Sequence, residues 1–457
     1  MTHQRSSLRT ALLASAAAAM LMVASAAAAQ DAAPTPAPAG SASADRPDPG
    51  ARNRGLFEDG RAEPKPGEEA KELRIAARLE LEMQQLDNFD LDDDEASDVT
   101  RIAPELRVEV TYEPDDDFLA FLSLELGERF ERRQGDGWDA RGKMEVREAY
   151  LHFKDVIEDV EIQVGRQRFN DRRDWLYDER LDALRFIYDE GGLTVEASVA
   201  RLGLAPIDLL HPKRRNKTDN FILRAEYELT RDWDIAAYAL VQEDRTADDE
   251  SPTFFGVQSR GKLVGALGHW LELSLQRGHD NDRKLRGNAV DAGLIYGFAA
   301  PFKPALFVGF ARGSGGRKGR IDRNFRQTGL QDNEDRITGL ANVRYYGELL
   351  DPTLSNLAIH TVGAGIRPSD ASSLELVWHN YRQVRLSDDE IRGSPLEARP
   401  EGDHRALGHE IDVIGALRLG DGLGLEAKLG YFSPGKAFDN DTNDNAFFVK
   451  TRLVYRF

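Results

Sequence analysis

From residue 73 onward the chain repeats one unit: a stretch of about ten residues in which apolar and polar side chains alternate, followed by a polar connection. The first copy, residues 73–83, has apolar side chains at its odd positions and mainly arginine and glutamate at its even ones. A period of two predicts β-strands whose two faces meet different environments. About eighteen such stretches follow one another, which predicts an all-β fold.

The connections between these stretches alternate between short and long. The short ones include YEPDD, DVIED, DEGG and LGDG. A soluble sandwich has no reason to gather every long loop at one end, whereas outer-membrane barrels combine short periplasmic turns with long extracellular loops. We therefore predict one antiparallel transmembrane β-barrel of about eighteen strands. The long, polar connections span residues 84–100, 128–142, 168–180, 203–218, 243–252, 313–355, 384–406 and 433–444.

One further stretch, GLANVRYYGEL at residues 339–349, could form another strand. It would make the strand number odd, and single-chain bacterial barrels have even numbers. We therefore expect this stretch to be a loop, folded into the lumen.

The last thirteen residues, NAFFVKTRLVYRF, form the clearest strand. Phe447, Val449, Leu453, Tyr455 and Phe457 alternate with a mostly cationic set. A strand that ends a chain on an aromatic residue is typical of outer-membrane barrels, whose assembly machinery reads it. The alternative is an ordinary sheet strand, and the repeated pattern before it favours the barrel.

The N-terminal part predicts export. Arg5 and Arg9 precede an apolar, alanine-rich run, and AAA at 27–29 fits a signal-peptidase site, so we expect residues 1–29 to be a cleaved signal peptide. Residues 30–70 are rich in alanine and proline and then charged, which predicts a disordered periplasmic lead-in before a barrel at 71–457. No later run reaches the ~20 apolar residues of a membrane-spanning helix.

Composition agrees with an envelope protein. The chain has no cysteine, and its formal charge of −19 argues against a nucleic-acid partner. A mean hydropathy of −0.51 excludes a helical membrane protein but not a barrel, in which only alternate strand residues face lipid.

Assigning the apolar face of each strand to lipid places the opposite face in the lumen. Acidic side chains are as numerous there as basic ones, so two interpretations stay open. Mixed charges could simply pair across strands. Alternatively, a track of guanidinium groups could bind a carboxylated or phosphorylated solute, because arginine holds planar oxyanions with two hydrogen bonds. The cations expected to line the pore include Arg74, Arg107, Arg185, Arg224, Arg418, Lys450 and Arg452.

Residues 147–189 carry the most specific motifs. Arg147 precedes the strand AYLHF, GRQRF follows at 165–169, and Asp174, Trp175 and Asp178 precede LDALRF at 181–186. Together with DPTLSNLAIHTVG at 351–363 and GYFSPGKAF at 430–438, these motifs resemble the alginate-export porins of Gram-negative outer membranes. The resemblance extends over roughly residues 73–457.

The resemblance implies a monomeric barrel of eighteen strands that passes an anionic polyuronate from the periplasm outward through an arginine-rich constriction. It also implies pore-lining roles for Arg147, Arg166 and Arg185, and a periplasmic export scaffold as partner. Arg166 shares the strand phase of Val164, so it reaches the lumen only if the strand ends or bulges at Gly165.

Asp174 and Asp178 are expected to hold the long loop after GRQRF over the pore by pairing with Arg168, Arg172 or Arg173. The alternative is a turn that is stabilised by its own salt bridges.

Metal and enzyme sites are not expected. The acidic runs at 87–98 and 439–445 have ligand oxygens at Ca²⁺-like density but lack the EF-hand pattern. Solvated loops, or loops bridged to lipopolysaccharide phosphates by divalent ions, are therefore the better account, and a specific Ca²⁺ site is the lesser alternative. The histidines lie in no G-x-S-x-G or H-E-x-x-H setting, which argues against catalysis, and no cofactor is expected.

Three functions remain as hypotheses. The first is a passive channel for anionic oligo- or polysaccharide, and the second is a general or small-anion porin on the same scaffold. The third is a structural or adhesive barrel with a plugged lumen. The abundance of acids in the lumen counts against a polyanion unless those acids are paired.

Overall fold

The computed structural model describes residues 72–92, 97–212, 217–246, 249–420, 422–438 and 443–457. The expected signal peptide (1–29) and lead-in (30–70) lie outside these residues. Within the described ranges, no helix has the length and hydrophobicity to cross a bilayer.

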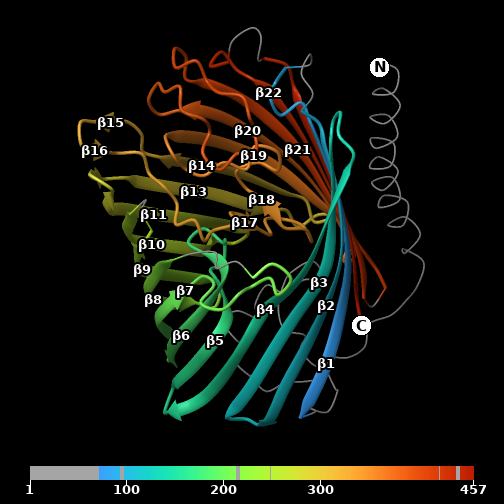
Figure 1. The fold of residues 1–457 in the computed structure, drawn as a ribbon, viewed down its shortest axis with the longest axis vertical. Coiled ribbons are helices and arrows are strands. Elements are labelled where there is room, and N and C mark those ends of the chain that lie inside the picture. The colour runs from blue at the N-terminus through green and yellow to red at the C-terminus, as the bar shows by residue number, and fades with distance from the viewer. Residues whose placement is uncertain (1–71, 93–96, 213–216, 247–248, 421, 439–442) are drawn as a thin grey trace.

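Eighteen long antiparallel strands form a closed barrel (Figure 1), which confirms the predicted fold class. Each strand pairs with the next, and the last closes the circle on the first through pairs such as Leu79 with Tyr455. The wall strands are β1 (Leu73–Asp87), β2 (Val99–Asp115), β3 (Phe118–Arg133), β4 (Trp138–Ile157), β5 (Val160–Asn170), β6 (Asp178–Glu190), β7 (Leu193–Arg201), β8 (Thr218–Thr230), β9 (Trp233–Asp244), β10 (Glu250–Val264), β11 (Leu267–Asp280), β13 (Asn288–Gly297), β14 (Ala305–Gly313), β19 (Leu357–Ser369), β20 (Ser372–Gln383), β21 (Ala406–Leu419), β22 (Leu423–Pro434) and β23 (Ala446–Arg456).

The apolar face of each strand points outward. Leu79 is 46% exposed, whereas its neighbour Arg78 is 6% exposed because it lies inside the barrel. This inversion of the usual globular pattern is what a lipid-facing wall requires, because the outer surface meets hydrocarbon and the lumen holds the polar groups.

Four long connections are at least five residues shorter than the sequence predicts. Those expected at 84–100 and 243–252 are reduced to 88–98 and 245–249, and two others shorten as follows. Residues 128–142 are not a loop, because β3 continues to Arg133 and β4 begins at Trp138, leaving a turn at 134–137. The connection expected at 168–180 is reduced to 171–177. Above the bilayer both faces of a hairpin meet water, so the apolar alternation disappears while backbone pairing continues.

Residues 339–349 do not belong to the wall, which confirms the expectation for this stretch. Its only strand, β18 (Val343–Arg344), pairs with β17 (Glu334–Asp335) in a separate small sheet. Three other short strands lie at the long-loop end: β12 (Arg283–Leu285), β15 (Arg317–Lys318) and β16 (Ile321–Asp322). β16 pairs with both β12 and β15.

Candidate functional site

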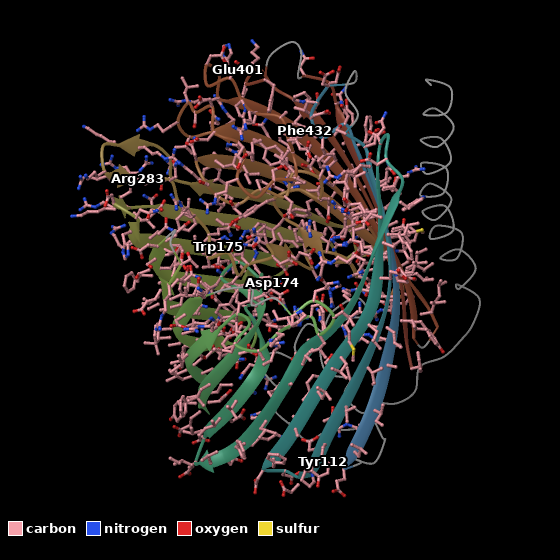
Figure 2. The ribbon with its side chains drawn as sticks, viewed as in Figure 1. Tyr112, Asp174, Trp175, Arg283, Glu401 and Phe432 are labelled. Atoms are coloured by element: carbon pink, nitrogen blue, oxygen red, sulfur yellow. The ribbon has the colours of Figure 1, made fainter. Side chains whose placement is uncertain are left out.

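Two loops fold into the lumen and form its packed interior. They are residues 171–177, after β5, and residues 323–356, which lead into β19; we call them the first and second inner loops. Their buried side chains, among them Trp175, Phe325 and Tyr346, join the inward residues of the wall in one apolar cluster. Figure 2 shows Asp174 and Trp175 near the middle of the barrel, well above Tyr112 at the short-turn end.

The two inner loops are bonded to each other. The Trp175 indole donates to the Tyr346 hydroxyl (2.9 Å), and the Thr328 hydroxyl donates to the Leu176 carbonyl oxygen (2.6 Å). The amides of Asp332 and Asn333 donate to the Asp174 carbonyl oxygen at 3.0 and 3.1 Å. The loops therefore form one unit, although more than 100 residues separate them in the sequence.

Carboxylates of the wall attach this unit. Arg173 lies 3.1 Å from Asp291 and stacks on Tyr345, with its guanidinium carbon 4.1 Å from the ring centre. Glu410 accepts hydrogen bonds from the amides of Leu349 (2.7 Å) and Leu350 (3.1 Å). Asp291 is therefore paired with an arginine and Glu410 is hydrogen-bonded to the loop backbone, so these two acids hold the loops in place.

Asp174 and Asp178 differ in their contacts. Asp178 pairs with Arg168 (2.6 Å), one of its three expected partners, while Arg172 and Arg173 bind Asp234 and Asp291 of the wall. Asp174 contributes mainly its backbone, which has φ of +50° and offers the carbonyl described above.

The side chain of Asp174 lies in an acidic cluster with Asp178, Asp332 and Glu334. Burial, and then the charge of Asp178, raises the pKa of Asp174 well above its usual value. The charge of Glu334, together with burial, raises the pKa of Asp332 to about 6. Burial alone would raise the pKa of Glu334, but Lys428 and Arg344 lower it to about 2.

Most of the arginines and lysines expected to line the pore have carboxylate partners. Such pairs reduce the net charge that a passing ion meets, although Arg107 and Arg147 share one acid, Glu125. The pairs are Arg74–Glu113 (2.9 Å), Arg107–Glu125 (2.8 Å), Arg147–Glu125 (3.3 Å), Arg185–Glu196 (2.5 Å), Arg224–Glu226, Lys450–Glu82 (2.8 Å) and Arg452–Glu426 (3.3 Å).

Arg166 has a different position from the one expected for it. Its guanidinium is 4% exposed and is bound to Asp182 and to backbone carbonyls in the wall. Its strand phase is that of Val164, which points outward, so we propose no role for Arg166 in the lumen.

Arg418 belongs to a group of four arginines that the sequence does not indicate. It lies near the short-turn end with Arg367 of β19, Arg456 of β23 and Arg336 of the second inner loop; we call these four residues the arginine cluster. Burial lowers the pKa of Arg336 to about 10, and the charges of the other three arginines act in the same direction against one glutamate, Glu426. The Nε atoms of Arg367 and Arg418 are buried and have no hydrogen-bond partner within the described part of the chain.

The second inner loop brings Arg336 to this end of the barrel. The amides of Thr338 and Leu340 donate to Glu375 (3.1 Å) and to the Ser373 hydroxyl (2.8 Å), close to the turn between β19 and β20. Nothing in the stretch NEDR at 333–336 predicts this, because a loop residue has no strand phase from which its position can be read.

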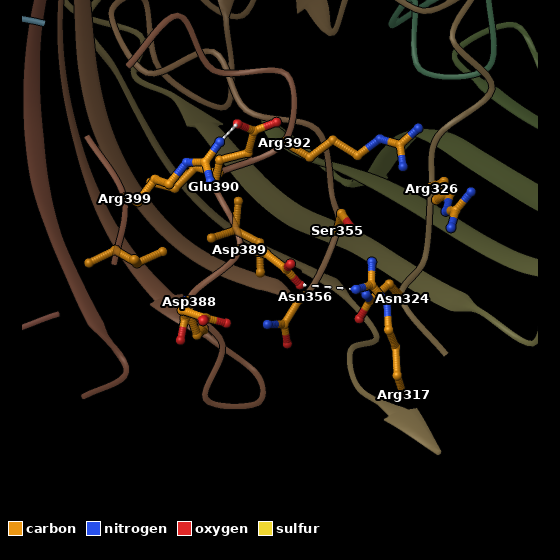
Figure 3. A pocket seen from close by; sticks show the side chains of 14 residues that line it. Arg317, Asn324, Arg326, Ser355, Asn356, Asp388, Asp389, Glu390, Arg392 and Arg399 are labelled. Carbon is orange, nitrogen blue, oxygen red and sulfur yellow. Dashed lines mark hydrogen bonds and ion pairs between the residues drawn. The ribbon is translucent and has the colours of Figure 1, made fainter. Parts of the chain in front are cut away.

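The long-loop end carries arginines and acids together. A cavity of about 430 Å³ lies between the loops there (Figure 3). Arg317 is 3.6 Å from Asp389, and Arg399 is 3.3 Å from Glu390. Arg317 and Arg399 thus each have an acidic partner in this cavity, whereas the arginine cluster brings four arginines close to one another.

The acidic runs show no metal site in the residues that are described. No group of three acidic or histidine side chains suited to a metal occurs within those ranges. Asp90 instead accepts from the Ser97 hydroxyl (2.6 Å). Residues 93–96 and 439–442 of these runs lie outside the described residues.

A closed barrel of eighteen strands, with an outward apolar face and a lumen narrowed by inner loops, defines an outer-membrane channel of the porin class. The chain matches the family model described as "Alginate export" over residues 71–450, and it belongs to that family. No curated protein matches the sequence.

Solved porins of Pseudomonas aeruginosa share the fold. OccK7 (OpdD) has a TM-score of 0.55 at 12% identity, over 84% of this chain and 99% of that one. OccK11 (OpdR) has 0.54 at 14% identity, over 84% and 96%. OccK2 (OpdF), solved in complex with glucuronate, has 0.54 at 12% identity, over 84% and 98%.

Proposed function

We propose that this chain is a passive channel for anionic saccharides of the uronate class, and that the arginine cluster is the site where they enter the narrow part of the lumen. The observation that carries the proposal is the arginine cluster itself, in which the charges of Arg418, Arg367 and Arg456 act on Arg336 together with that of Glu426. Arginine suits the task because it stays charged and binds carboxylates with two parallel hydrogen bonds.

The position of the cluster supports outward movement. The short turns of such barrels face the periplasm, so a polymer delivered there by a periplasmic scaffold meets arginine before it meets the inner loops. Glucuronate bound to OccK2 supports a single uronate as the unit recognised in this fold. The protein works as a monomer in the outer membrane, is inserted by the barrel assembly machinery and is surrounded by lipopolysaccharide. No step requires catalysis.

The test is the reversal potential of single channels in a planar bilayer under a KCl gradient, with and without oligouronates. The variant is Arg367→Gln/Arg418→Gln, which removes two charges whose Nε atoms have no hydrogen-bond partner among the residues that the structure describes. We expect anion selectivity and oligouronate block in the wild type, and loss of both in the variant. The matched control is Arg283→Gln/Arg286→Gln, because these two arginines are exposed at the long-loop end.

The outcomes separate the alternatives. Anion selectivity without oligouronate block indicates a small-anion porin, and cation selectivity that the variant does not change excludes the cluster. An absence of conductance in every variant indicates the structural or adhesive barrel.

A further inference from the structure

The barrel wall is interrupted between β4 and β5. On one side, β4 pairs with β3 as far as Trp138, but on the other its pairing with β5 ends at Ala149 and Arg166. Gly165 marks the separation, with φ of +123°, and a Cβ there would lie 2.3 Å from the Ala149 carbonyl oxygen. Glycine therefore lets β5 turn away from β4 at this point.

A segment from a distant loop covers the open edge of β4. Residues 204–210, which we call the closing segment, belong to the connection between β7 and β8. The Val146 amide donates to the Ile207 carbonyl oxygen (3.0 Å), and the Leu209 amide donates to the Met144 carbonyl oxygen (2.7 Å). Glu145 and Asp208 form the corresponding isolated bridge. A short bridge thus replaces the continuous ladder found elsewhere in the wall.

Arg166 holds the closing segment in place. Its guanidinium donates to the carbonyl oxygens of Ala205 (2.8 Å) and Pro206 (3.4 Å), and also to that of Val146 (3.0 Å). The same group binds both oxygens of Asp182, at 2.9 and 3.0 Å. One side chain therefore ties β4, β5, β6 and the closing segment together.

The Arg166–Asp182 pair lies on the outer side of the wall. Val164 lies two residues before Arg166 on β5, and Leu184 lies two residues after Asp182 on β6, so each shares a face of the wall with the pair. Both are exposed on the lipid-facing surface. An ion pair on that face is unfavourable in hydrocarbon, yet Arg166 is buried because the closing segment covers it. Movement of the segment would expose both the pair and the gap.

The surroundings of the gap are apolar. Leu204 and Leu210 of the closing segment are 55% and 56% exposed. Below the gap, an open hollow of about 300 Å³ on the outer wall is lined by apolar and aromatic side chains that include Ala149, Leu151 and Val164. Ala149 lies at the point where β4 and β5 separate, so the hollow leads directly to the gap.

We propose that the β4–β5 gap is a lateral opening, closed by residues 204–210 and held by Arg166, through which the acyl chain of a membrane amphiphile enters the lumen. The hollow gives the chain an apolar surface, and displacement of the closing segment breaks only a few hydrogen bonds. This route is separate from the axial path of a saccharide and does not depend on it.

The test uses lipids with brominated acyl chains, which quench tryptophan fluorescence on contact. The reporter chain carries Trp138→Phe, Trp233→Phe and Trp378→Phe, leaving Trp175 and Trp270 in the lumen. Because the sequence has no cysteine, Glu145→Cys/Asp208→Cys can form one disulfide that locks the closing segment to β4. In proteoliposomes we expect quenching in the reduced protein, its loss on oxidation and its return on reduction.

A second variant and a control complete the design. Arg166→Ala in the reporter chain should increase quenching, because the closing segment loses its attachment. The control Leu271→Cys/Ala292→Cys places a disulfide between β11 and β13, where the wall is continuous, and should leave quenching unchanged. Equal quenching in the locked and reduced forms of the Glu145/Asp208 variant overturns the proposal, even if Arg166→Ala does not fold.

Discussion

Trp175 and Tyr346, which are 171 positions apart in the sequence, share a buried hydrogen bond of 2.9 Å. The Tyr346 hydroxyl also donates to Asp291 of β13 over 2.9 Å. One hydroxyl therefore joins the first inner loop, the second inner loop and the wall. The two inner loops narrow the lumen, and their position depends on this three-way contact, because neither loop has regular secondary structure beyond the two-residue strands β17 and β18.

Tyr346→Phe should loosen the constriction. The substitution leaves the Trp175 indole N–H without its partner, which costs about 1–3 kcal/mol for a buried group, while Asp291 Oδ2 loses one hydrogen bond and keeps the one from Arg173. We expect greater open-channel current noise and faster proteolysis within residues 323–356, with an unchanged barrel. Tyr188→Phe is the control, since Tyr188 bonds Glu190 at an exposed turn. Identical noise in both variants would show that the contact does not hold the loops.

The acidic cluster should make the inner loops sensitive to pH. The pKa of Asp332 is raised to about 6 from an unfolded value near 3.8, mainly by the charge of Glu334. A raised carboxyl pKa means that the docked loop binds more protons than the released loop, so this contribution is fully present below pH ~3.8 and is lost as pH rises through 6. We expect more frequent loop opening, seen as current noise, as pH increases from 4 to 7.

Asp332→Asn checks this assignment, because it removes the titrating group and keeps the shape. The dependence of noise on pH between 4 and 7 should become flatter in the variant. Glu334 does not account for this window, since its pKa is lowered to about 2 and its contribution is lost only in stronger acid. A variant with the wild-type pH profile would contradict the role of Asp332.

The strands could be predicted from the sequence because each barrel strand separates two environments. Outward residues such as Leu79 and Val164 meet hydrocarbon while their neighbours meet the lumen, so a period of two appears directly in the residue types. Periodicity does not predict the strand pairing of Glu131 with Asp139. These residues lie in the extension of β3 and β4 above the membrane, where apolar and polar residues need not alternate.

The site could be predicted only in part. Arg418 follows from strand phase, but Arg336 lies on a loop whose path is set by contacts with Glu375 and Ser373. The family motif predicts that Arg166 lines the pore, but its actual position depends on a distant loop that covers it. Contacts between segments far apart in sequence leave no local pattern, so spacing and periodicity could not show them.

Gly347 should be essential for docking of the second inner loop. It has φ of +115°, and a Cβ there would lie 2.3 Å from the Tyr381 hydroxyl and 2.6 Å from Glu410 Oε2. Gly347→Ala therefore combines backbone strain of about 1 kcal/mol with a steric clash of about 1–3 kcal/mol. We expect displacement of residues 344–350 from the wall, measured as increased hydrogen exchange of the Leu349 and Leu350 amides.

Gly329→Ala is the matched control for this prediction. Gly329 also has a positive φ, +75°, but nothing lies within 4 Å of its Cβ position. The control therefore tests backbone strain alone and should change exchange at Leu349 and Leu350 much less. Equal effects of the two substitutions would mean that a clash of the new Cβ with Tyr381 and Glu410 is not the cause of the displacement.

Glu125 should limit the anion selectivity of the channel. Its carboxylate lies 2.8 Å from Arg107 and Lys143 and 3.3 Å from Arg147, and Lys143 also lies 2.5 Å from Glu105, so two acids offset three cations. Glu125→Gln leaves these cations in excess, and an added unit of positive charge near the path is worth about 1 kcal/mol to a passing carboxylate, or about fivefold in the half-blocking concentration of an oligouronate. Glu131→Gln, which loosens a pair with Arg101 (2.8 Å) near the long-loop end, provides the comparison. If block strengthens equally in both variants, the effect is one of total charge; if it strengthens only in Glu125→Gln, the pairing of acids and arginines inside the lumen sets how strongly the channel holds an anion.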